Sequence, residues 1–244
     1  MIFDFKTMEY YSNNTVMAIV GIDKLSLLDY EDKVACVLFT KNCNFRCQFC
    51  HNGESVLEAT EALSFADILA YLKTRIGLID AVVFSGGEPT LEEDLEVKIK
   101  EVKNLGFLIK LDTNGTNPEL LEKLLDEGLI DYVAMDIKNS PSLYAETAGV
   151  KNVNLDNIEK SVSIIMKKAP DYEFRTTLVK EFHERMDYDS FLSLIKGCKK
   201  LFLQKFVDRE GCIVKGLHEL DIIEANKLKD YLSKEIPSVT LRGY

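Results

Sequence analysis

Three cysteines lie close together in the chain. Cys43, Cys47 and Cys50 are separated by three and then by two residues, and Phe49 stands in the second gap. Cysteine thiolates hold iron–sulfur clusters, and such a cluster usually takes four of them. Three thiolates leave one iron free to bind a small molecule. The spacing therefore predicts an iron–sulfur cluster with an open coordination position.

The spacing of the three thiols also allows two simpler roles. They could form a structural zinc site with a distant fourth ligand, although zinc knuckles usually come as two pairs of ligands. They could also be unrelated to one another. The remaining cysteines need no metal, because Cys36 lies in an apolar run, Cys198 ends a helix-like stretch and Cys212 lies in a predicted loop.

Four polar segments each follow a short apolar run. They are Cys43–Asn52, Ser85–Thr90, Asp112–Gly115 and Asp136–Lys138. Short, continuously apolar runs are typical of strands buried on both faces, as in parallel sheets. The carboxyl ends of parallel barrel strands form the active-site face. We therefore expect the four segments to meet at one end of a barrel.

Together these segments resemble the radical S-adenosylmethionine (SAM) enzymes, and within them the glycyl-radical-enzyme activases. The resemblance rests on Cys43–Asn52, Gly86–Pro89, Asp112–Gly115 and Asp136–Lys138. The segment Gly21–Tyr30 is similar, more specifically, to the activating proteins of anaerobic ribonucleoside-triphosphate reductase. The resemblance covers roughly residues 20–244.

The chain departs from that pattern at two places. Glu31-Asp32 stands where Pro-Gly is expected. Phe206 stands near the place where pyruvate formate-lyase activases carry a histidine that helps to hold the methionine carboxylate. A phenylalanine side chain cannot make that contact.

The resemblance implies a 4Fe–4S cluster on Cys43, Cys47 and Cys50, together with bound SAM. Glycine permits close backbone approach, aromatic rings stack on adenine, and charged groups suit the methionine end of SAM. A monovalent cation is also implied beside Asp112, Thr113 and Asp136. The residues implied in SAM binding are Phe49, Asn52, Gly86, Gly87, Glu88, Asp112, Thr113, Asp136 and Lys138.

Some polar residues could also have plainer roles. Lys138 could be a solvated loop lysine. His51 is expected to belong to the cluster loop rather than to carry protons, and His183 and His218 are expected at the surface.

The implied activity is reductive cleavage of SAM to a 5′-deoxyadenosyl radical, which places a glycyl radical on a partner enzyme. Anaerobic ribonucleotide reductase is the favoured partner, with a flavodoxin- or ferredoxin-type electron donor. Two alternatives remain. The first is a radical SAM enzyme that acts on a small molecule, as in a 7-carboxy-7-deazaguanine synthase-like reaction. The second is a non-catalytic iron–sulfur redox protein.

The elements that must position these residues alternate along the chain. Strands are expected at Val34–Phe39, Ala81–Phe84, Phe107–Leu111, Tyr132–Met135, Phe174–Val179, Leu201–Phe206 and Val239–Arg242. Segments with helical period lie between them, on residues such as Leu95, Ile99 and Val102. Ser64 and Asn117 are expected helix caps.

Strand–helix alternation predicts parallel βαβ units. The fold class is therefore α/β, a partial (βα)6 barrel of the radical-SAM type. We expect a single domain over residues 1–244, with an N-terminal extension over residues 1–30 and an extra C-terminal strand.

Composition limits the classes of protein further. The chain has 244 residues, and 46% of them are hydrophobic, which is ample for a core. It has no run of apolar residues long enough for a membrane span and no basic, apolar leader, so a cytoplasmic protein is expected. The net charge of −10 argues against nucleic-acid binding, which needs a basic face.

Overall fold

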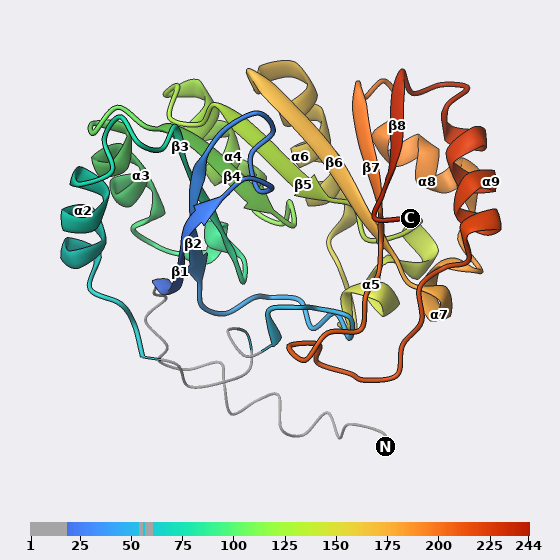
Figure 1. Cartoon of the computed structure of the whole chain (residues 1–244). Coiled ribbons are helices and arrows are strands. Elements are labelled where there is room, and N and C mark those ends of the chain that lie inside the picture. Colours follow the sequence, from blue (N-terminus) through green and yellow to red (C-terminus); the bar gives the residue numbers. More distant parts are fainter. Residues whose placement is uncertain (1–18, 54–55, 57–60) are drawn as a thin grey trace.

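The computed structural model describes residues 19–53, 56 and 61–244. Within these residues, eight strands form one curved sheet in chain order, β1 to β8 (Figure 1). Strands β2 to β8 run parallel, and β1 (Ile19–Ser26) pairs antiparallel with β2. The parallel strands are β2 (Ala35–Thr40), β3 (Ala81–Gly86), β4 (Leu108–Thr113), β5 (Tyr132–Asp136), β6 (Asp171–Leu178), β7 (Lys200–Lys205) and β8 (Ser238–Arg242). The α/β class and the partial barrel are confirmed.

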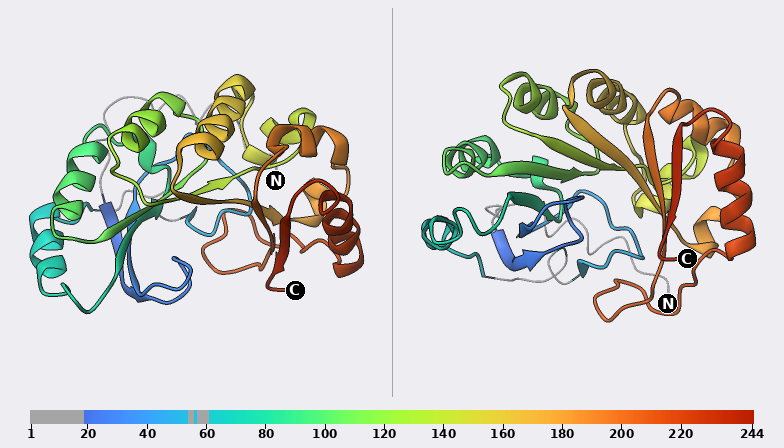
Figure 2. Two further views of the ribbon diagram at one scale, coloured as in Figure 1. Left: turned by 90° about the horizontal axis from the view of Figure 1, so that it is seen from above. Right: turned by 45° about the horizontal axis from the view of Figure 1, so that its top comes forward.

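Helices cover the outer side of the curved sheet, and β1 and β8 form its two edges (Figure 2). The helices have the following bounds: α2 (Phe65–Lys73), α3 (Leu95–Lys103), α4 (Pro118–Asp126), α5 (Pro141–Ala148), α6 (Leu155–Lys168), α7 (Lys180–His183), α8 (Tyr188–Ile195), α9 (Ile222–Leu232) and the 3-10 turn η2 (Pro89–Leu91). The expected caps are present: Ser64 accepts a hydrogen bond from the Asp67 N–H, and Asn117 from the Leu120 N–H.

Alternating side chains of the strands build two apolar layers. Cys36 and Leu38 of β2 belong to the large core between sheet and helices, whereas Ala35 and Val37 belong to a smaller cluster on the concave side. Burial on both faces explains why these strands are continuously apolar in sequence.

The expected N-terminal extension contains a strand. Residues 1–18 of that extension lie outside the described residues, but Ile19–Ser26 form β1 at the edge of the sheet. Asp23 and Lys24 of β1 are exposed, so β1 lacks the continuous apolar run of a buried parallel strand. An edge strand can keep polar side chains in solvent, which is why residue pattern alone did not predict it.

The segment after β1 contacts the barrel interior at the end away from the polar loops. The Ser26 hydroxyl donates to Asp29 Oδ2 (2.5 Å), and Lys110 Nζ donates to the Asp29 carbonyl (2.6 Å). The ring of Tyr30 packs on that of Tyr132, with centroids 5.3 Å apart. These contacts give several residues of Gly21–Tyr30 a role in the fold.

None of the helices in the described ranges is long and apolar enough to cross a bilayer.

Candidate active site

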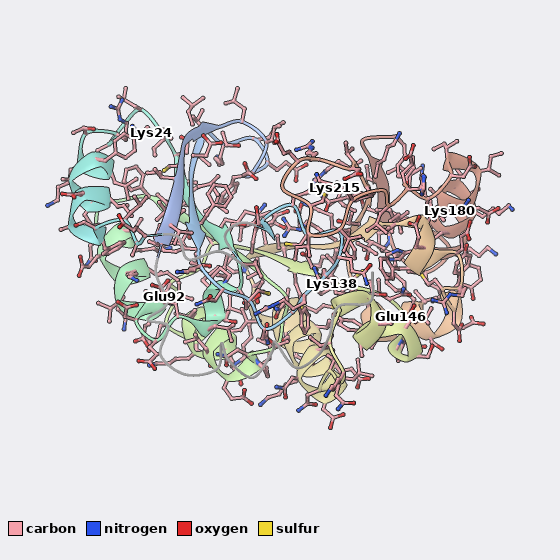
Figure 3. The ribbon with its side chains drawn as sticks, turned by 90° about the horizontal axis from the view of Figure 1, so that it is seen from below. Lys24, Glu92, Lys138, Glu146, Lys180 and Lys215 are labelled. Carbon is pink, nitrogen blue, oxygen red and sulfur yellow. The ribbon has the colours of Figure 1, made fainter. Side chains whose placement is uncertain are left out.

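The polar loops meet at the carboxyl ends of the parallel strands, at the bottom of Figure 1. Figure 3 views this end, with Lys138 near its middle. Every residue that the sequence associates with the cluster or with SAM lines one cavity there. The lining includes Cys43, Cys47, Phe49, Cys50, Asn52, Gly86, Gly87, Glu88, Asp112, Thr113, Asp136 and Lys138. The structure therefore confirms that the four polar segments meet at one end of the barrel.

The three thiols open into this cavity from the loop after β2. Burial raises the pKa of the Cys43 thiol to about 12 and that of Cys47 to about 11, and it also raises the pKa of Cys50. The backbone N–H of Phe45 lies 3.3 Å from Cys43 Sγ and can donate to a thiolate there. Buried thiols of this kind stay protonated at neutral pH until a metal takes the place of the proton. Their donor set fits an iron–sulfur cluster.

Gly86 and Gly87 allow the cluster loop, which follows β2 and carries the three thiols, to come close to the end of β3. Gly87 N–H donates to the Thr40 carbonyl (2.9 Å) and Glu88 N–H to the Asn42 carbonyl (2.8 Å). A Cβ on Gly87 would lie 1.7 Å from Asn42 O, and one on Gly86 would lie 2.5 Å from Thr40 N. The glycines were expected to let SAM approach. In the structure, their missing Cβ atoms make room for the cluster loop.

The Glu88 carboxylate is buried and already bonded within the protein. Oε1 accepts from the hydroxyls of Thr90 (2.5 Å) and Thr113 (2.7 Å), and Oε2 accepts from Asn114 N–H (2.6 Å). Burial raises the pKa of Glu88, and these hydrogen bonds oppose the rise. The side chain therefore fixes the loop after β4 from inside the protein.

Asp136, Lys138 and Arg175 form a charged group across β5 and β6. Lys138 Nζ lies 2.9 Å from Asp136 Oδ2, and Arg175 Nε lies 2.9 Å from Asp136 Oδ1. Burial opposes ionisation of Asp136, but the charges of Lys138 and Arg175 outweigh it and lower its pKa to about 2. The Lys138 side chain is 14% exposed, so the alternative of a solvated loop lysine is wrong.

The two carboxylate oxygens of Asp112 face two different cations, Arg175 and Lys110. Oδ2 accepts from the Ser85 hydroxyl (2.9 Å) and lies 3.4 Å from Arg175 Nη1. Oδ1 is buried, has no hydrogen-bond partner among the described residues and lies 3.9 Å from Lys110 Nζ. A buried carboxylate oxygen without a hydrogen bond is costly, and the ammonium group of Lys110 offsets part of this cost.

The resemblance implied a monovalent cation beside Asp112, Thr113 and Asp136. In the structure, the guanidinium of Arg175 lies between the carboxylates of Asp112 and Asp136. A positive charge therefore already stands where the cation was expected. The residues present fit an internal cation, Arg175, better than a bound one.

The residues expected to contact adenine are held by their neighbours. Phe49 packs on Phe182 and Phe206, with centroids 5.9 and 6.5 Å away. Asn52 Nδ2 donates to the Gly86 carbonyl (2.8 Å). Phe206 stacks on His51 at 5.8 Å. No imidazole stands at position 206, and His51 belongs to the cluster loop as expected.

His183 is buried, which corrects the expectation that it lies at the surface; His218 is exposed. The Nδ1 atom of His183 lies 3.0 Å from the Val179 nitrogen and 2.9 Å from the Val179 carbonyl oxygen, and Nε2 lies 3.0 Å from the Lys138 carbonyl. A carbonyl can only accept and Nε2 has no other partner in the described part of the chain, so the proton of the neutral ring is assigned to Nε2, which donates to Lys138. His183 therefore fixes the backbone of Lys138.

The family model described as the radical SAM superfamily matches residues 37–192. The chain belongs to the radical SAM superfamily. Members of this family use a 4Fe–4S cluster and SAM, and solved structures with similar folds contain bound SAM. The cofactors expected from the sequence are those of the family.

Two named relatives are similar to much of this radical SAM chain. A Methanocaldococcus jannaschii protein with the provisional name glycyl-radical enzyme activating enzyme is 32% identical over 91% of this chain and 94% of its own length. The GTP 3′,8-cyclase of Helicobacter pylori strain J99 is 28% identical over 77% of this chain and 60% of its own length. The chain thus spans nearly all of the first relative and less than two thirds of the second.

Solved radical SAM structures share the fold. The structure titled native anSMEcpe with bound AdoMet and Cp18Cys peptide has a TM-score of 0.59 and 19% identity, and covers 82% of this chain and 60% of that one. Streptococcus suis SuiB has a TM-score of 0.61 and 16% identity, and covers 83% of this chain and 47% of that one.

The cavity also contains residues that the sequence did not assign. Arg175 and Thr177 come from β6, Asn114 from the loop after β4, and Ile213 from the loop after β7. Arg175 left a signal, because it is a charged residue inside a predicted strand. Asn114 belongs to the recognised segment Asp112–Gly115 but had no role. Nothing in the sequence around Ile213 indicated that this residue would line the site.

Proposed function

We propose that this radical SAM enzyme is an activase that generates a glycyl radical on a partner protein. One observation carries the proposal: the three thiols open into the same cavity as Asp112, Asp136 and Lys138. The likeness to the M. jannaschii protein over nearly its whole length supports the activase class.

In this proposal Cys43, Cys47 and Cys50 hold the cluster. Lys138 and Asp136 bind the charged methionine end of SAM, and Asp112 lines the same cavity. The aromatic side of the site, Phe49, packs beside adenine. When bound, the cluster and SAM supply one-electron cleavage of the S–C5′ bond, which gives methionine and a 5′-deoxyadenosyl radical; the cofactors carry the hard chemistry.

The chain's own residues position and enclose the reactants. Lys138 and Arg175 hold Asp136 ionised, so the site keeps a fixed arrangement of charges around SAM. Ile213 and Phe49 are apolar side chains in the cavity wall, and in this proposal they keep water away from the bound reactants. Exclusion of water protects a reactive intermediate from side reactions.

The proposed substrate is the Cα–H group of a glycine in an extended loop of the partner. With the cofactors bound, the hydrogen atom of that C–H bond would move to C5′, and the unpaired electron would stay on the glycine. The sheet is not closed, because β1 and β8 are its edges. An open barrel gives a peptide loop more room than a closed one.

Anaerobic ribonucleoside-triphosphate reductase is the proposed partner, and a flavodoxin- or ferredoxin-type protein is the proposed electron donor. The choice of reductase rests on the resemblance of Gly21–Tyr30. In the structure that segment packs against the concave interior through Asp29 and Tyr30. The choice of this partner therefore rests on the sequence resemblance of Gly21–Tyr30 alone.

A small-molecule substrate is the second candidate. The likeness to GTP 3′,8-cyclases favours this class, and the cavity has a charged wall in Asp112 and Arg175 that suits a polar metabolite. The 7-carboxy-7-deazaguanine synthase-like reaction belongs to the same class of alternatives.

The experiment that separates the two candidates mixes reduced protein, SAM and the reductase without oxygen. The activase proposal predicts a glycyl-radical signal in electron paramagnetic resonance (EPR) and 5′-deoxyadenosine in comparable amount. Reductase with its radical-site glycine changed to alanine is the control and should give no signal. Rapid, partner-independent turnover of a metabolite would contradict the activase proposal.

A further inference from the structure

Asn114 lies where the loop after β4 meets the cluster loop. Its side chain is buried, with 5% exposed. Nδ2 lies 3.8 Å from Cys43 Sγ, within the range for a hydrogen bond to sulfur, and 2.8 Å from Asn44 Oδ1. An amide group is thus in contact with one of the three thiols.

The orientation of the amide follows from its other partners. The backbone N–H of Thr116 lies 3.0 Å from Asn114 Oδ1, and the Thr116 hydroxyl lies 2.7 Å from the same atom. A backbone N–H can only donate, so the atom that it meets is the oxygen. The amino group, which can only donate, therefore points toward Cys43.

A closed ring of side chains holds Asn114 in this position. Asn44 Nδ2 donates to Thr116 Oγ1 (2.8 Å), Thr116 donates to Asn114, and Asn114 donates back to Asn44. The backbone N–H of Asn114 donates to the buried carboxylate of Glu88 (2.6 Å). The donor near Cys43 is thereby fixed from both the side chain and the backbone.

Negative charge on Cys43 needs such a donor. The backbone N–H of Phe45, 3.3 Å from the sulfur, is one donor that can meet a thiolate there. Asn114 is the side-chain donor on the same atom.

We propose that Asn114 donates a hydrogen bond to the Cys43 thiolate and thereby raises the reduction potential of the iron–sulfur cluster. Reduction adds negative charge to a cluster and its sulfur ligands, and hydrogen bonds to those sulfurs stabilise the reduced form. Asn114 is a positioning and tuning residue, since it acts through Cys43. The inference rests on the assignment of the cluster to the three cysteines.

The test is an anaerobic redox titration followed by EPR on reconstituted protein. Asn114→Ala removes the donor, and Asn114→Asp keeps the shape but replaces the donor with a negative charge. The midpoint potential should fall from wild type to Asn114→Ala and further to Asn114→Asp, at wild-type iron and sulfide content. Deuterium exchange followed by electron–nuclear double resonance should show one exchangeable coupling fewer in Asn114→Ala.

Asn226→Ala is the control, at an exposed asparagine whose amide donates to the Ile222 carbonyl. It removes the same amide group away from the cluster loop, so its potential should stay at the wild-type value. Equal potentials in wild type and Asn114→Ala would overturn the inference, as would failure of both Asn114 variants to hold a cluster, which would make the residue one of assembly. Absence of a cluster in the wild type itself would instead contradict the assignment of the three cysteines.

Discussion

Lys138 shows how single residues define the site. It is mostly buried, pairs with Asp136 and is held through its carbonyl by His183. A buried lysine without such partners would lose its charge. Here the charge of Asp136 overcomes the effect of burial and raises the pKa of Lys138.

Lys138→Ala should weaken SAM binding by about tenfold or more, which is about 1.4 kcal/mol or more. The reason is the loss of the positive charge proposed to meet the methionine carboxylate. Calorimetry on anaerobically reconstituted protein measures this, and iron content should not change. Lys180→Ala, at an exposed lysine paired with Glu184 at 3.6 Å, is the control. Unchanged affinity in Lys138→Ala would remove this residue from the SAM site.

His183→Leu should lower the free energy of unfolding by about 1–3 kcal/mol at neutral pH, since the Lys138 carbonyl and the Val179 N–H lose their partner. Burial lowers the pKa of His183 below its ordinary value of 6.5. The unfolded chain therefore takes up a proton that the folded one does not. The stability that wild-type His183 contributes is present above pH 6.5 and is lost as the pH falls below it.

Urea unfolding of wild type and His183→Leu across this pH range checks the prediction. The difference in the free energy of unfolding between wild type and His183→Leu should become smaller toward acid pH. His218→Gln, at an exposed position, should run parallel to wild type. If the difference in the free energy of unfolding stayed constant with pH, the folded protein would not hold His183 in its neutral form.

At the scale of elements, the site is made where two loops contact each other. The loop after β2 carries the thiols, and the loop after β3 carries Gly86 and Gly87, whose backbone contacts Thr40 and Asn42. This contact fixes the cluster loop against the end of the sheet.

Gly87→Ala should displace the cluster loop, because the added Cβ would lie 1.7 Å from Asn42 O. Overpacking of this kind costs about 1–3 kcal/mol, and the iron content after reconstitution should fall. Gly21→Ala is the control, since its Cβ would lie 3.4 Å from the nearest atom. Iron analysis and thermal unfolding measure both effects. Wild-type iron content and stability in Gly87→Ala would show that the loop tolerates the methyl group.

The elements also show what the sequence could predict. Strands β2 to β5 are largely buried, and their short, mostly apolar runs identify them with bounds close to those observed. The edge strand β8 was also expected, although Val239 is its one buried residue. The capping residues Ser64 and Asn117 mark true helix starts. The edge strand β1 was missed, because it keeps Asp23 and Lys24 in solvent. The cavity residues on the recognised segments were predicted together, because parallel strands bring their carboxyl ends to one face.

Contacts between distant segments were not predictable in the same way. His183 meets Lys138 across 45 residues of sequence, and no local pattern distinguishes it from a surface histidine. Arg175 required knowledge that β6 lies beside β5 and turns this side chain toward Asp136. Gly86 and Gly87 were expected to let SAM approach, but the structure places the cluster loop against them. This contact between separate segments could not be read from the local sequence either.

At the scale of the whole molecule, the two ends of the barrel have different roles. One end holds the thiols and the charged group around Lys138 (Figure 3). The other contacts the segment after β1, where Asp29 bonds to Lys110 and Tyr30 packs on Tyr132. The residues suited to chemistry therefore gather at the carboxyl ends of the strands, as in other parallel barrels.

The central claim is that Cys43, Cys47 and Cys50 hold a cluster to which SAM binds. The most direct test is EPR on the anaerobically reconstituted and reduced protein, with and without SAM. Wild type should show the signal of a reduced 4Fe–4S cluster, and SAM should change its g-values. Changing any one of the three cysteines to alanine should strongly reduce the signal, whereas Cys36→Ala and Cys198→Ala should keep it. A wild-type signal in the variant that lacks all three cysteines, or a signal that SAM leaves unchanged, would contradict the claim.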